Sequence, residues 1–278
     1  MIEEDTKTSS SNRQSTVIHP TAIIDPKACL DSSVQVGPYS IIGPDVYIGP
    51  NCTIGPHVVL KGHLELGSDN RVFQFASVGE DCQDKKYKGE PTSLIIGDRN
   101  TIRECATLQR GTAQEQAITR IGSGNLFMAY SHVGHDCVVG DECVFANSAT
   151  IAGHVKVGSN VILGGFTGVH QFCQIGDLAM TGMCSAVNMD IPAYVRVQGN
   201  MAKAQGLNLE GMRRQGLDKA VIQLLQSAYK QVYRDNLKLD EALQQLDQRY
   251  SSLTSPTQRL ALSVFLNSIR QSKRGLLR

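Results

Sequence analysis

Residues 34–60 read VQVGPYSIIGPDVYIGPNCTIGPHVVL, and an aliphatic residue returns at every sixth position. Val36, Ile42, Ile48 and Ile54 mark this phase, and each is followed by glycine. A helix of 3.6 residues per turn cannot keep such a phase, and a strand of period two would place apolar residues more often. The rhythm is typical of a parallel β-helix, in which short strands and sharp turns direct one aliphatic side chain per face to the axis.

The six-residue phase extends over most of the chain in three runs. These runs cover residues 18–78, 96–108 and 121–187 and contain 11, 3 and 12 repeats. Two polar interruptions, at residues 80–93 and 111–119, are expected to be loops. Since three faces complete one coil of about 18 residues, the sequence predicts roughly nine coils and a prism on the order of 40 Å tall.

The pattern changes after about residue 190. We expect a disordered leader at 1–16, a hexapeptide-repeat domain at 17–190 and a helical domain at 191–278. The expected fold is mainly β: a left-handed parallel β-helix followed by a small α-helical C-terminal domain, which would cover the strand edges of the last coil. The amphipathic segments predicted to be helices are residues 217–235, 239–250 and 255–271.

Composition excludes several classes of protein. The net charge is only +1, which argues against a nucleic-acid partner. No apolar run approaches the length of a membrane span, and the polar start does not resemble a secretory signal. The eight cysteines contain no C-x-x-C pair, and Cys52, Cys137, Cys143 and Cys173 share one phase of the repeat. We therefore expect small buried thiols in a reducing cytoplasm.

The stretch 129–154, AYSHVGHDCVVGDECVFANSATIAGH, carries the strongest chemical signal. It contains three of the seven histidines and the pair His135-Asp136. Because residues one coil apart stack on one face, Gly153 is expected beside His135 in the neighbouring coil, with His154 one residue along. A glycine leaves its backbone N–H uncovered. This arrangement indicates a general base next to an oxyanion donor.

Other readings of the histidines remain open. His170 and Gln171 fall in the following coil, and a surface histidine is most often simply solvated. Three histidines can also ligate zinc with one open position, but the close spacing of His132 and His135 argues against a metal, and none is expected. The early histidines lack an acidic or histidine neighbourhood and are expected to be structural or solvated: His19, His57 and His63.

Inserted loops on a solenoid often carry binding function. The first loop contains Gln83, Asp84 and Lys86, which offer donors and acceptors for a sugar or a phosphate. The alternative is a tolerated insertion. The pair Arg213-Arg214 either binds an anion or forms an exposed helical turn.

Several stretches together resemble the UDP-N-acetylglucosamine acyltransferases, which catalyse the first step of lipid A synthesis. The resemblance extends from about residue 17 to residue 278 and includes both insertions and the C-terminal region. Its most specific pieces are FQFASVGEDCQDKKYKGEPT (73–92), SHVGHDCVVG (131–140), GVHQFC (168–173), QGNMAKAQGLNLEGMRRQG (198–216) and the terminal RGLLR.

This resemblance implies transfer of a 3-hydroxyacyl group from acyl carrier protein to the 3-hydroxyl of the GlcNAc unit of UDP-GlcNAc. It implies no cofactor, and a homotrimer with active sites in clefts between subunits. By resemblance, His135 removes the hydroxyl proton, Asp136 orients or polarises His135, and the Gly153 N–H binds the oxyanion.

The resemblance also assigns binding positions. Met183 matches the position that limits acyl length, where a bulky residue shortens the groove. Its offset from His135 is about 2.7 coils, roughly 13 Å along the axis, which predicts a medium-length chain of on the order of ten carbons. The substrate-binding positions implied are His132, His154, His170, Gln171, Gln83, Asp84, Lys86, Asn208, Glu210 and Arg214, of which the last three match a segment associated with nucleotide or carrier-arm binding.

Two residues depart from the family pattern. Gln109 stands in TLQRG where the family usually has histidine, so it keeps a capacity to bind but not to carry a proton. Gln215 stands where a basic residue is common. Two alternatives stay open: a related acyltransferase with an amino-sugar acceptor or an acyl-CoA donor, and a non-catalytic paralogue that binds carrier protein or nucleotide sugar.

Overall fold

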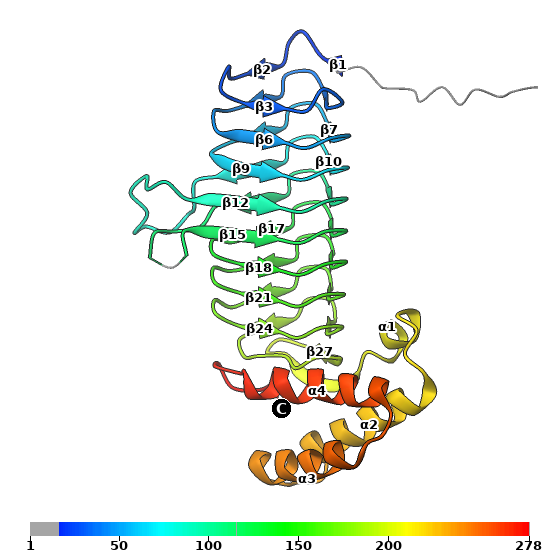
Figure 1. Cartoon of the computed structure of the whole chain (residues 1–278). Coiled ribbons are helices and arrows are strands. Elements are labelled where there is room, and N and C mark those ends of the chain that lie inside the picture. Colours follow the sequence, from blue (N-terminus) through cyan, green and yellow to red (C-terminus); the bar gives the residue numbers. More distant parts are fainter. Residues whose placement is uncertain (1–16, 115, 278) are drawn as a thin grey trace, which may run out of the picture.

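The computed structural model describes residues 17–114 and 116–277, so the leader predicted at 1–16 lies outside the described residues. Short strands wind into a three-sided left-handed β-helix whose last coil rests on helices (Figure 1). Successive coils contribute strands to three sheets, which we call A, B and C in chain order. The predicted fold class is confirmed.

Sheet A contains β1 (Val17–Ile18), β4 (Gln35–Val36), β7 (Thr53–Ile54), β10 (Arg71–Val72), β13 (Thr101–Ile102), β16 (Leu126–Phe127), β19 (Val144–Phe145), β22 (Ile162–Leu163), β25 (Met180–Thr181), β27 (Val195–Gln198) and β28 (Lys203–Leu207). Sheet B contains β2 (Ile23–Ile24), β5 (Ile41–Ile42), β8 (Val59–Leu60), β11 (Ser77–Glu80), β14 (Thr107–Gln109), β17 (His132–Val133), β20 (Thr150–Ile151), β23 (Gly168–Val169) and β26 (Ala186–Val187). Sheet C contains β3 (Cys29–Leu30), β6 (Val46–Ile48), β9 (His63–Leu66), β12 (Ser93–Ile96), β15 (Ile118–Ile121), β18 (Val138–Val139), β21 (Lys156–Val157) and β24 (Gln174–Ile175).

The strand register shows the repeating coil directly. His132 pairs with Thr150 in the next coil, and β17 and β20 run parallel. The offset between paired residues is larger where a loop is inserted, as between Thr107 and His132, which pair across the second loop. Both loops, 81–92 and 110–117, leave sheet B and return in sheet C. Both therefore lie at the corner between sheets B and C, which we call the B–C corner.

The aliphatic phase of the repeat forms the core. Val36, Ile42 and Ile48 are at most 2% exposed, and the aliphatic positions of later coils are buried in the same way. Phe127 and Phe145 pack on each other with ring centroids 4.9 Å apart. Each plug contacts the coils above and below it, so the stability of the prism comes from contacts between neighbouring coils.

Many turns place a residue in the left-handed region, three positions after the aliphatic plug. Asp136, His154 and Phe172 occupy this position in successive coils, with φ of 57°, 63° and 67°. A left-handed conformation is uncommon for residues other than glycine, yet the stacked coils impose it repeatedly. Side chains at this position consequently line up along a corner.

The strands continue beyond the boundary predicted at residue 190. β27 pairs parallel to β25, and β28 pairs antiparallel to β27. Within β27, Val195 and Val197 are buried while Arg196 and Gln198 are exposed. This alternation of period two is a strand signal that follows the end of the six-residue phase. The hairpin pairs the edge that sheet A would otherwise leave open.

Four helices complete the described chain: α1 (Leu209–Arg214), α2 (Lys219–Tyr233), α3 (Leu239–Ser252) and α4 (Pro256–Arg270). The last three match the predicted amphipathic segments, whereas α1 was not predicted. Ser255 caps α4, and Pro256 occupies its first turn, as expected. None of the helices in residues 17–114 and 116–277 is long and apolar enough to cross a membrane.

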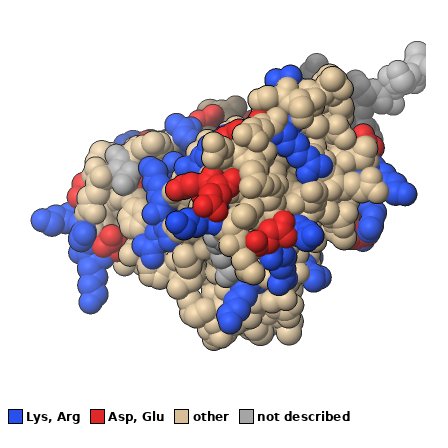
Figure 2. All heavy atoms as spheres, turned by 90° about the horizontal axis from the view of Figure 1, so that it is seen from below, with Lys and Arg blue, Asp and Glu red and all other residues tan. Residues whose placement is uncertain are grey.

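Charge is divided unevenly between the two parts of the chain. Residues 191–278 contain 14 Lys and Arg against 6 Asp and Glu, whereas residues 1–190 contain 13 against 20. Seen from the helical end, basic side chains are spread over much of the surface with acidic ones between them (Figure 2). The C-terminal part of the chain is thus positive and the preceding part negative.

The cysteines are free thiols with different exposures. Cys52, Cys82, Cys137, Cys143 and Cys173 are buried, whereas Cys29 and Cys184 are exposed and Cys105 is partly exposed. The prediction of buried thiols is wrong for Cys29 and Cys184, because they occupy outward and turn positions of the coil. Burial raises the pKa of both Cys137 and Cys143 to about 12, which keeps these two thiols protonated.

Candidate active site

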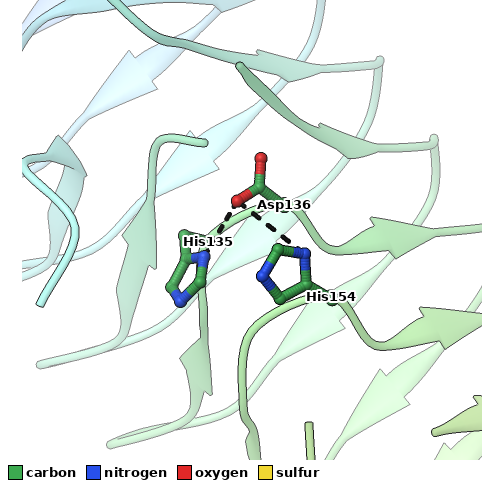
Figure 3. Close-up of side chains that lie close together, drawn as sticks. All are labelled: His135, Asp136 and His154. Atoms are coloured by element: carbon green, nitrogen blue, oxygen red, sulfur yellow. Dashed lines mark hydrogen bonds and ion pairs between the residues drawn. The ribbon is translucent and has the colours of Figure 1, made fainter. Parts of the chain in front are cut away.

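The turn between β17 and β18 carries the central pair of the site. His135 Nδ1 lies 2.9 Å from Asp136 Oδ2, and the Asp136 side chain is only 3% exposed (Figure 3). Asp136 adopts the left-handed turn conformation, which directs its carboxylate to the B–C corner beside the ring of the preceding residue. The sequence neighbours His135 and Asp136 are therefore also hydrogen-bonded partners.

Thr112, from the second loop, holds the Asp136 carboxylate. Its N–H donates to Asp136 Oδ1 at 3.0 Å, and its hydroxyl donates to Oδ2 at 2.7 Å. Burial by itself would raise the pKa of Asp136, but the hydrogen bonds from His135 and Thr112 outweigh it and hold the pKa below the usual value. An ionised carboxylate can only accept hydrogen bonds. His135 Nδ1 therefore donates, and in the neutral imidazole the lone pair is on Nε2.

Gly153 lies against that lone pair, as the register of the coils predicts. A Cβ built on Gly153 would lie 2.5 Å from both Nε2 and Cε1 of His135, so no larger residue fits without moving the ring. Stacking of the coils does not require a hydrogen bond from the N–H at this turn position, since six equivalent positions are proline: Pro20, Pro26, Pro38, Pro44, Pro50 and Pro56. In other coils this N–H donates to a side chain, as Ser123 N does to Asp141 Oδ1. Within the described chain no group accepts a hydrogen bond from the Gly153 N–H, so it is available to a ligand.

His154 shares the Asp136 carboxylate from the next coil. Its Nδ1 lies 3.9 Å from Asp136 Oδ2, and its ring meets the His135 ring edge-on with centroids 4.8 Å apart (Figure 3). On its other side His154 stacks on Phe172, with centroids 4.4 Å apart. Asp136, His154 and Phe172 thus form a column along the B–C corner.

His132 precedes this cluster on β17. Its Nδ1 lies 2.7 Å from Thr107 Oγ1. Burial, together with the nearby His135, lowers the pKa of His132, which keeps this imidazole neutral. His132 can therefore donate or accept a hydrogen bond toward a ligand with its other nitrogen.

His135, Asp136 and His154 are also the only described group that could hold a metal ion, with ligand atoms all within 4.8 Å of one another. His132, which the zinc interpretation would include, is not part of this group. The expectation that no metal takes part stays a prediction.

The coil below brings in the C-terminal end of the chain. His170 and Gln171 are exposed beside Phe172. Arg274 Nη2 lies 3.3 Å from His170 Nδ1, although the two residues are 104 positions apart. The histidines of three successive coils therefore lie along one corner, and the corner ends at the C-terminal tail.

The loop residues lie at this same corner, in the coils above His135. Gln83 and Lys86 are exposed, and Asp84 Oδ1 accepts a hydrogen bond from the Lys86 N–H, which fixes the local turn. Arg110 ties the two loops together through Asp81 and the Tyr87 hydroxyl. Gln109 is 5% exposed and pairs with Glu80 in sheet B.

The α1 helix lies to the side of the last coils (Figure 1), whereas His135 follows β17 in an earlier coil. Asn208 is buried; it accepts a hydrogen bond from Gly211 N at 3.1 Å and donates one to Leu178 O at 3.0 Å. These bonds use the Asn208 amide to cap α1 and to hold it to the coil of Leu178. The role of Asn208 as a substrate contact stays a prediction. Glu210 and Arg214 form an exposed pair at 3.0 Å, and Gln215 ends the helix.

Met183 lies at another corner of the prism than His135, and its role as the acyl-length ruler stays a prediction. It is 65% exposed and lies in the turn from β25 to β26, at the corner between sheets A and B, which we call the A–B corner. His135 lies at the B–C corner. The offset between the two residues is not a whole number of coils, so the rise along the axis gives their separation in height but not the corner at which each lies. The two side chains do not share a groove of a single chain.

Sequence reasoning missed several members of the site. Thr112 follows no motif, and Phe172 becomes relevant only through stacking on the neighbouring coil. Thr107 and Arg274 come from another coil and from the C-terminal tail. Phe172 could have been predicted from the register of the coils, since it lies one coil after His154 at the same turn position.

Comparisons with known proteins identify the class to which this fold belongs. Residues 30–62 and 118–153 match the model of the bacterial hexapeptide transferases, and residues 190–277 match the second domain of UDP-N-acetylglucosamine O-acyltransferase. The prism and its histidine corner thus define a hexapeptide-repeat transferase.

Among curated proteins, the acyl-[acyl-carrier-protein]–UDP-N-acetylglucosamine O-acyltransferase of Stutzerimonas stutzeri is 49% identical over 78% of this chain and 82% of its own length. The solved structure of LpxA from Acinetobacter baumannii is 48% identical with a TM-score of 0.89, covering 94% of this chain and all of that one. The UDP-N-acetylglucosamine acyltransferase of Francisella novicida is 36% identical with a TM-score of 0.90, covering 94% of both chains. This chain belongs to the acyl-[acyl-carrier-protein]–UDP-N-acetylglucosamine O-acyltransferase family.

Proposed function

We propose that this enzyme transfers a 3-hydroxyacyl group from acyl carrier protein to the 3-hydroxyl of the GlcNAc unit of UDP-GlcNAc, in the cytoplasm, as the first step of lipid A synthesis. The observation that carries the proposal is the position of His135. Its Nδ1 is bonded to an ionised Asp136, and its Nε2 faces the Gly153 backbone. The two substrates proposed are those named for the related O-acyltransferases.

The residues at this corner suffice for direct acyl transfer. His135 Nε2 takes the proton of the sugar 3-hydroxyl as that oxygen attacks the thioester carbonyl carbon. A C–O bond forms, and the Gly153 N–H donates to the resulting oxyanion. The C–S bond then breaks, and the leaving thiolate takes the proton back from His135. Asp136 stabilises the imidazolium between these steps through Nδ1–H, as the carboxylate does in a catalytic triad.

A thiol intermediate is not part of this mechanism. Cys137 immediately follows Asp136, but it is fully buried and its pKa is raised to about 12. A thiol nucleophile needs a lowered pKa and access to the substrate. The sugar hydroxyl therefore attacks the thioester directly.

We further propose that the active form is a homotrimer with the site between subunits. An acyl chain bound at His135 reaches Met183 only if Met183 comes from a second copy, because the two lie at different corners of one prism. The A–B corner exposes Phe166 and Met183 in the coils between His135 and the end of the prism, and these apolar side chains suit a wall of an acyl groove. Other large apolar side chains exposed at this corner lie in earlier coils: Tyr39, Phe75 and Tyr130.

The remaining binding positions follow from this arrangement. His132, His154, His170 and Gln171 line the cleft near the reacting atoms, and Gln83, Asp84 and Lys86 close it from the loop two coils above. Glu210 and Arg214 belong to the site only if α1 of one subunit reaches the cleft of the next. Asn208 caps α1 and joins the site under the same condition.

One assay tests the reaction: purified protein, UDP-GlcNAc and 3-hydroxyacyl carrier proteins of several chain lengths, with His135→Ala in parallel. We expect transfer by the wild type and a loss of 10²–10⁴-fold, on the order expected for a general base, in the variant. Treatment of the product with mild alkali separates an ester from an amide and so distinguishes the hydroxyl from an amino-sugar acceptor.

Undiminished turnover by His135→Ala would remove His135 as the base. Absence of transfer by the wild type at every chain length would favour a non-catalytic paralogue. Sedimentation of the wild type at assay concentration measures the oligomeric state, and a monomeric active enzyme would contradict the shared site.

A further inference from the structure

The C-terminal tail after α4, residues 271–277, is fixed to the last coil by one buried carboxylate. Asp190 is 1% exposed. Its Oδ2 accepts hydrogen bonds from Ser272 Oγ at 2.8 Å, Lys273 N at 2.8 Å and Arg274 N at 3.0 Å. A carboxylate that accepts several such bonds holds a segment firmly, because each charge-assisted bond is stronger than a neutral one.

The apolar end of the tail adds to this anchor. Leu276 and Leu277 are 8% and 4% exposed, and Leu277 N donates to Asp190 O at 3.0 Å. The side chains of Lys273 and Arg274, in contrast, are exposed. The terminal motif therefore anchors its leucines and presents its two cations.

Both cations lie at the B–C corner. Arg274 contacts His170, and Lys273 lines a cavity of about 200 Å³ together with Asp136, His154 and Phe172. Lys156 of β21 lines the same cavity. The tail thus extends the reaction corner by two positive side chains that come from the far end of the sequence.

These cations are not neutralised by the part of the chain that the structure describes. None of Lys156, Lys273 and Arg274 forms an ion pair with a described carboxylate. Asp136 shares the cavity, but its oxygens already accept from Thr112 and His135. A concave site with unpaired cations next to reacting groups attracts an anionic part of a ligand.

We propose that the tail is part of the substrate site, and that Lys273 and Arg274, with Lys156, bind a phosphate group of a substrate. This inference rests on the proposed function and names a contact within it. A phosphate can come from the phosphopantetheine arm of the carrier or from the diphosphate of the nucleotide sugar. Guanidinium and ammonium groups recognise both through the same charge-assisted hydrogen bonds.

The test compares donors that differ only in the phosphate: 3-hydroxyacyl pantetheine and 3-hydroxyacyl phosphopantetheine, each with UDP-GlcNAc. We expect the ratio of their kcat/KM values to favour the phosphorylated donor in the wild type and to fall roughly tenfold in Arg274→Gln and Lys273→Gln. Lys219→Gln is the matched control, because it removes one exposed positive charge at the first residue of α2 and leaves the tail intact.

A second arm measures the KM for UDP-GlcNAc and inhibition by UDP in the same variants. If the KM for UDP-GlcNAc and the inhibition constant of UDP both rise roughly tenfold, while the ratio of kcat/KM between the two donors is unchanged, the bound phosphate belongs to the nucleotide. Values within about twofold of the wild type in both arms overturn the inference. A wild type inactive with every donor contradicts the proposed function instead. Arg274→Lys, which keeps the charge, and thermal melts of each variant separate lost binding from lost folding.

Discussion

His154 and His57 occupy the same backbone position in different coils, and only one of them lies in a reactive site. Both are left-handed turn residues, with φ of 63° and 55°. The N–H of each donates to a carbonyl at the equivalent place in the preceding coil: His154 to His135 at 2.9 Å, and His57 to Pro38 at 3.0 Å. The backbone therefore does not distinguish them.

Their neighbours do. At the A–B corner, His57 lies between the rings of Tyr39 and Phe75, at 5.1 and 5.4 Å. At the B–C corner, His154 meets the His135 ring, and Asp136 takes the place that an aromatic ring takes beside His57. The β-helix supplies regular stacking at every corner. A reactive site forms where one of the stacked turn residues is a carboxylate that an inserted loop buries, as Asp136 is.

The largest effect expected from breaking this arrangement comes from Gly153→Ala. The added Cβ would displace the His135 ring from a position 2.5 Å away, at a glycine whose backbone is otherwise compatible with alanine. Displacement of a catalytic group by about 1 Å costs on the order of 100-fold in rate. We expect kcat to fall by about that factor while the protein still folds, as measured by steady-state kinetics and thermal melting.

Gly168→Ala is the control for this substitution. Gly168 lies on β23 of the adjoining sheet B, and a Cβ there would meet nothing within 4 Å. Its activity should stay within about twofold of the wild type. An equal loss in both variants would mean that Gly153 matters for the coil rather than for His135.

The next effect concerns the loop that distinguishes the B–C corner. Thr112→Val removes the hydroxyl that donates to Asp136 Oδ2 but leaves the backbone N–H in place. Loss of one hydrogen bond to a buried charge costs about 2 kcal/mol, so we expect a fall in kcat of roughly tenfold or more with little change in KM. Thr112→Ser keeps the hydroxyl and should restore kcat; a Ser variant as slow as Val would argue against a positioning role.

The same variant has a defined pH dependence. Since the folded pKa of Asp136 is lowered, the carboxylate stabilises the native state above its unfolded pKa of about 3.9, and this stabilisation is lost as the pH falls through the folded value. The difference in unfolding free energy between wild type and Thr112→Val should therefore be full above about pH 4 and shrink below it. Denaturant titrations across this range measure the difference.

Much of the fold follows from one periodic signal. The positions Val36, Ile42 and Ile48 are enough to define the coil, because each plug has the same environment one repeat later. The register of the coils then places Gly153 against His135 from sequence alone. Local pattern and global fold agree here, which is the condition under which a sequence specifies its structure well.

What could not be predicted depends on contacts that no period encodes. Thr112 reaches Asp136 because a loop of irregular length folds back over the corner. Arg274 reaches His170 from the far end of the sequence through the Asp190 anchor. The rise along the axis gives the height of Met183, but rotation around the axis puts it at a different corner. The buried amide of Asn208 shows the same limit, since its cap on α1 depends on Leu178 in an earlier coil.

Met183→Gly tests whether the two corners cooperate. If Met183 of one subunit ends the acyl groove that begins at His135 of another, glycine should extend the groove and shift preference toward longer donors. Each buried methylene contributes about 0.8 kcal/mol, so two more carbons correspond to roughly a tenfold change in relative kcat/KM. Competition between 3-hydroxyacyl carrier proteins of different length measures the shift, and an unchanged preference contradicts the ruler.

The smallest effect is expected from His57→Ala. His57 has the same turn position as His154, but both of its neighbours along the corner are aromatic rings and neither is a carboxylate. These two ring contacts contribute about 1 kcal/mol to stability. We expect a slightly lower melting temperature, activity within about twofold of the wild type, and an unchanged sedimentation coefficient. A marked loss of activity in a variant that keeps its oligomeric state would show that the A–B corner takes part in chemistry as well as in packing. Retained activity would mean that the turns of His57 and His154, which share one backbone conformation, differ in function because different side chains stack on them.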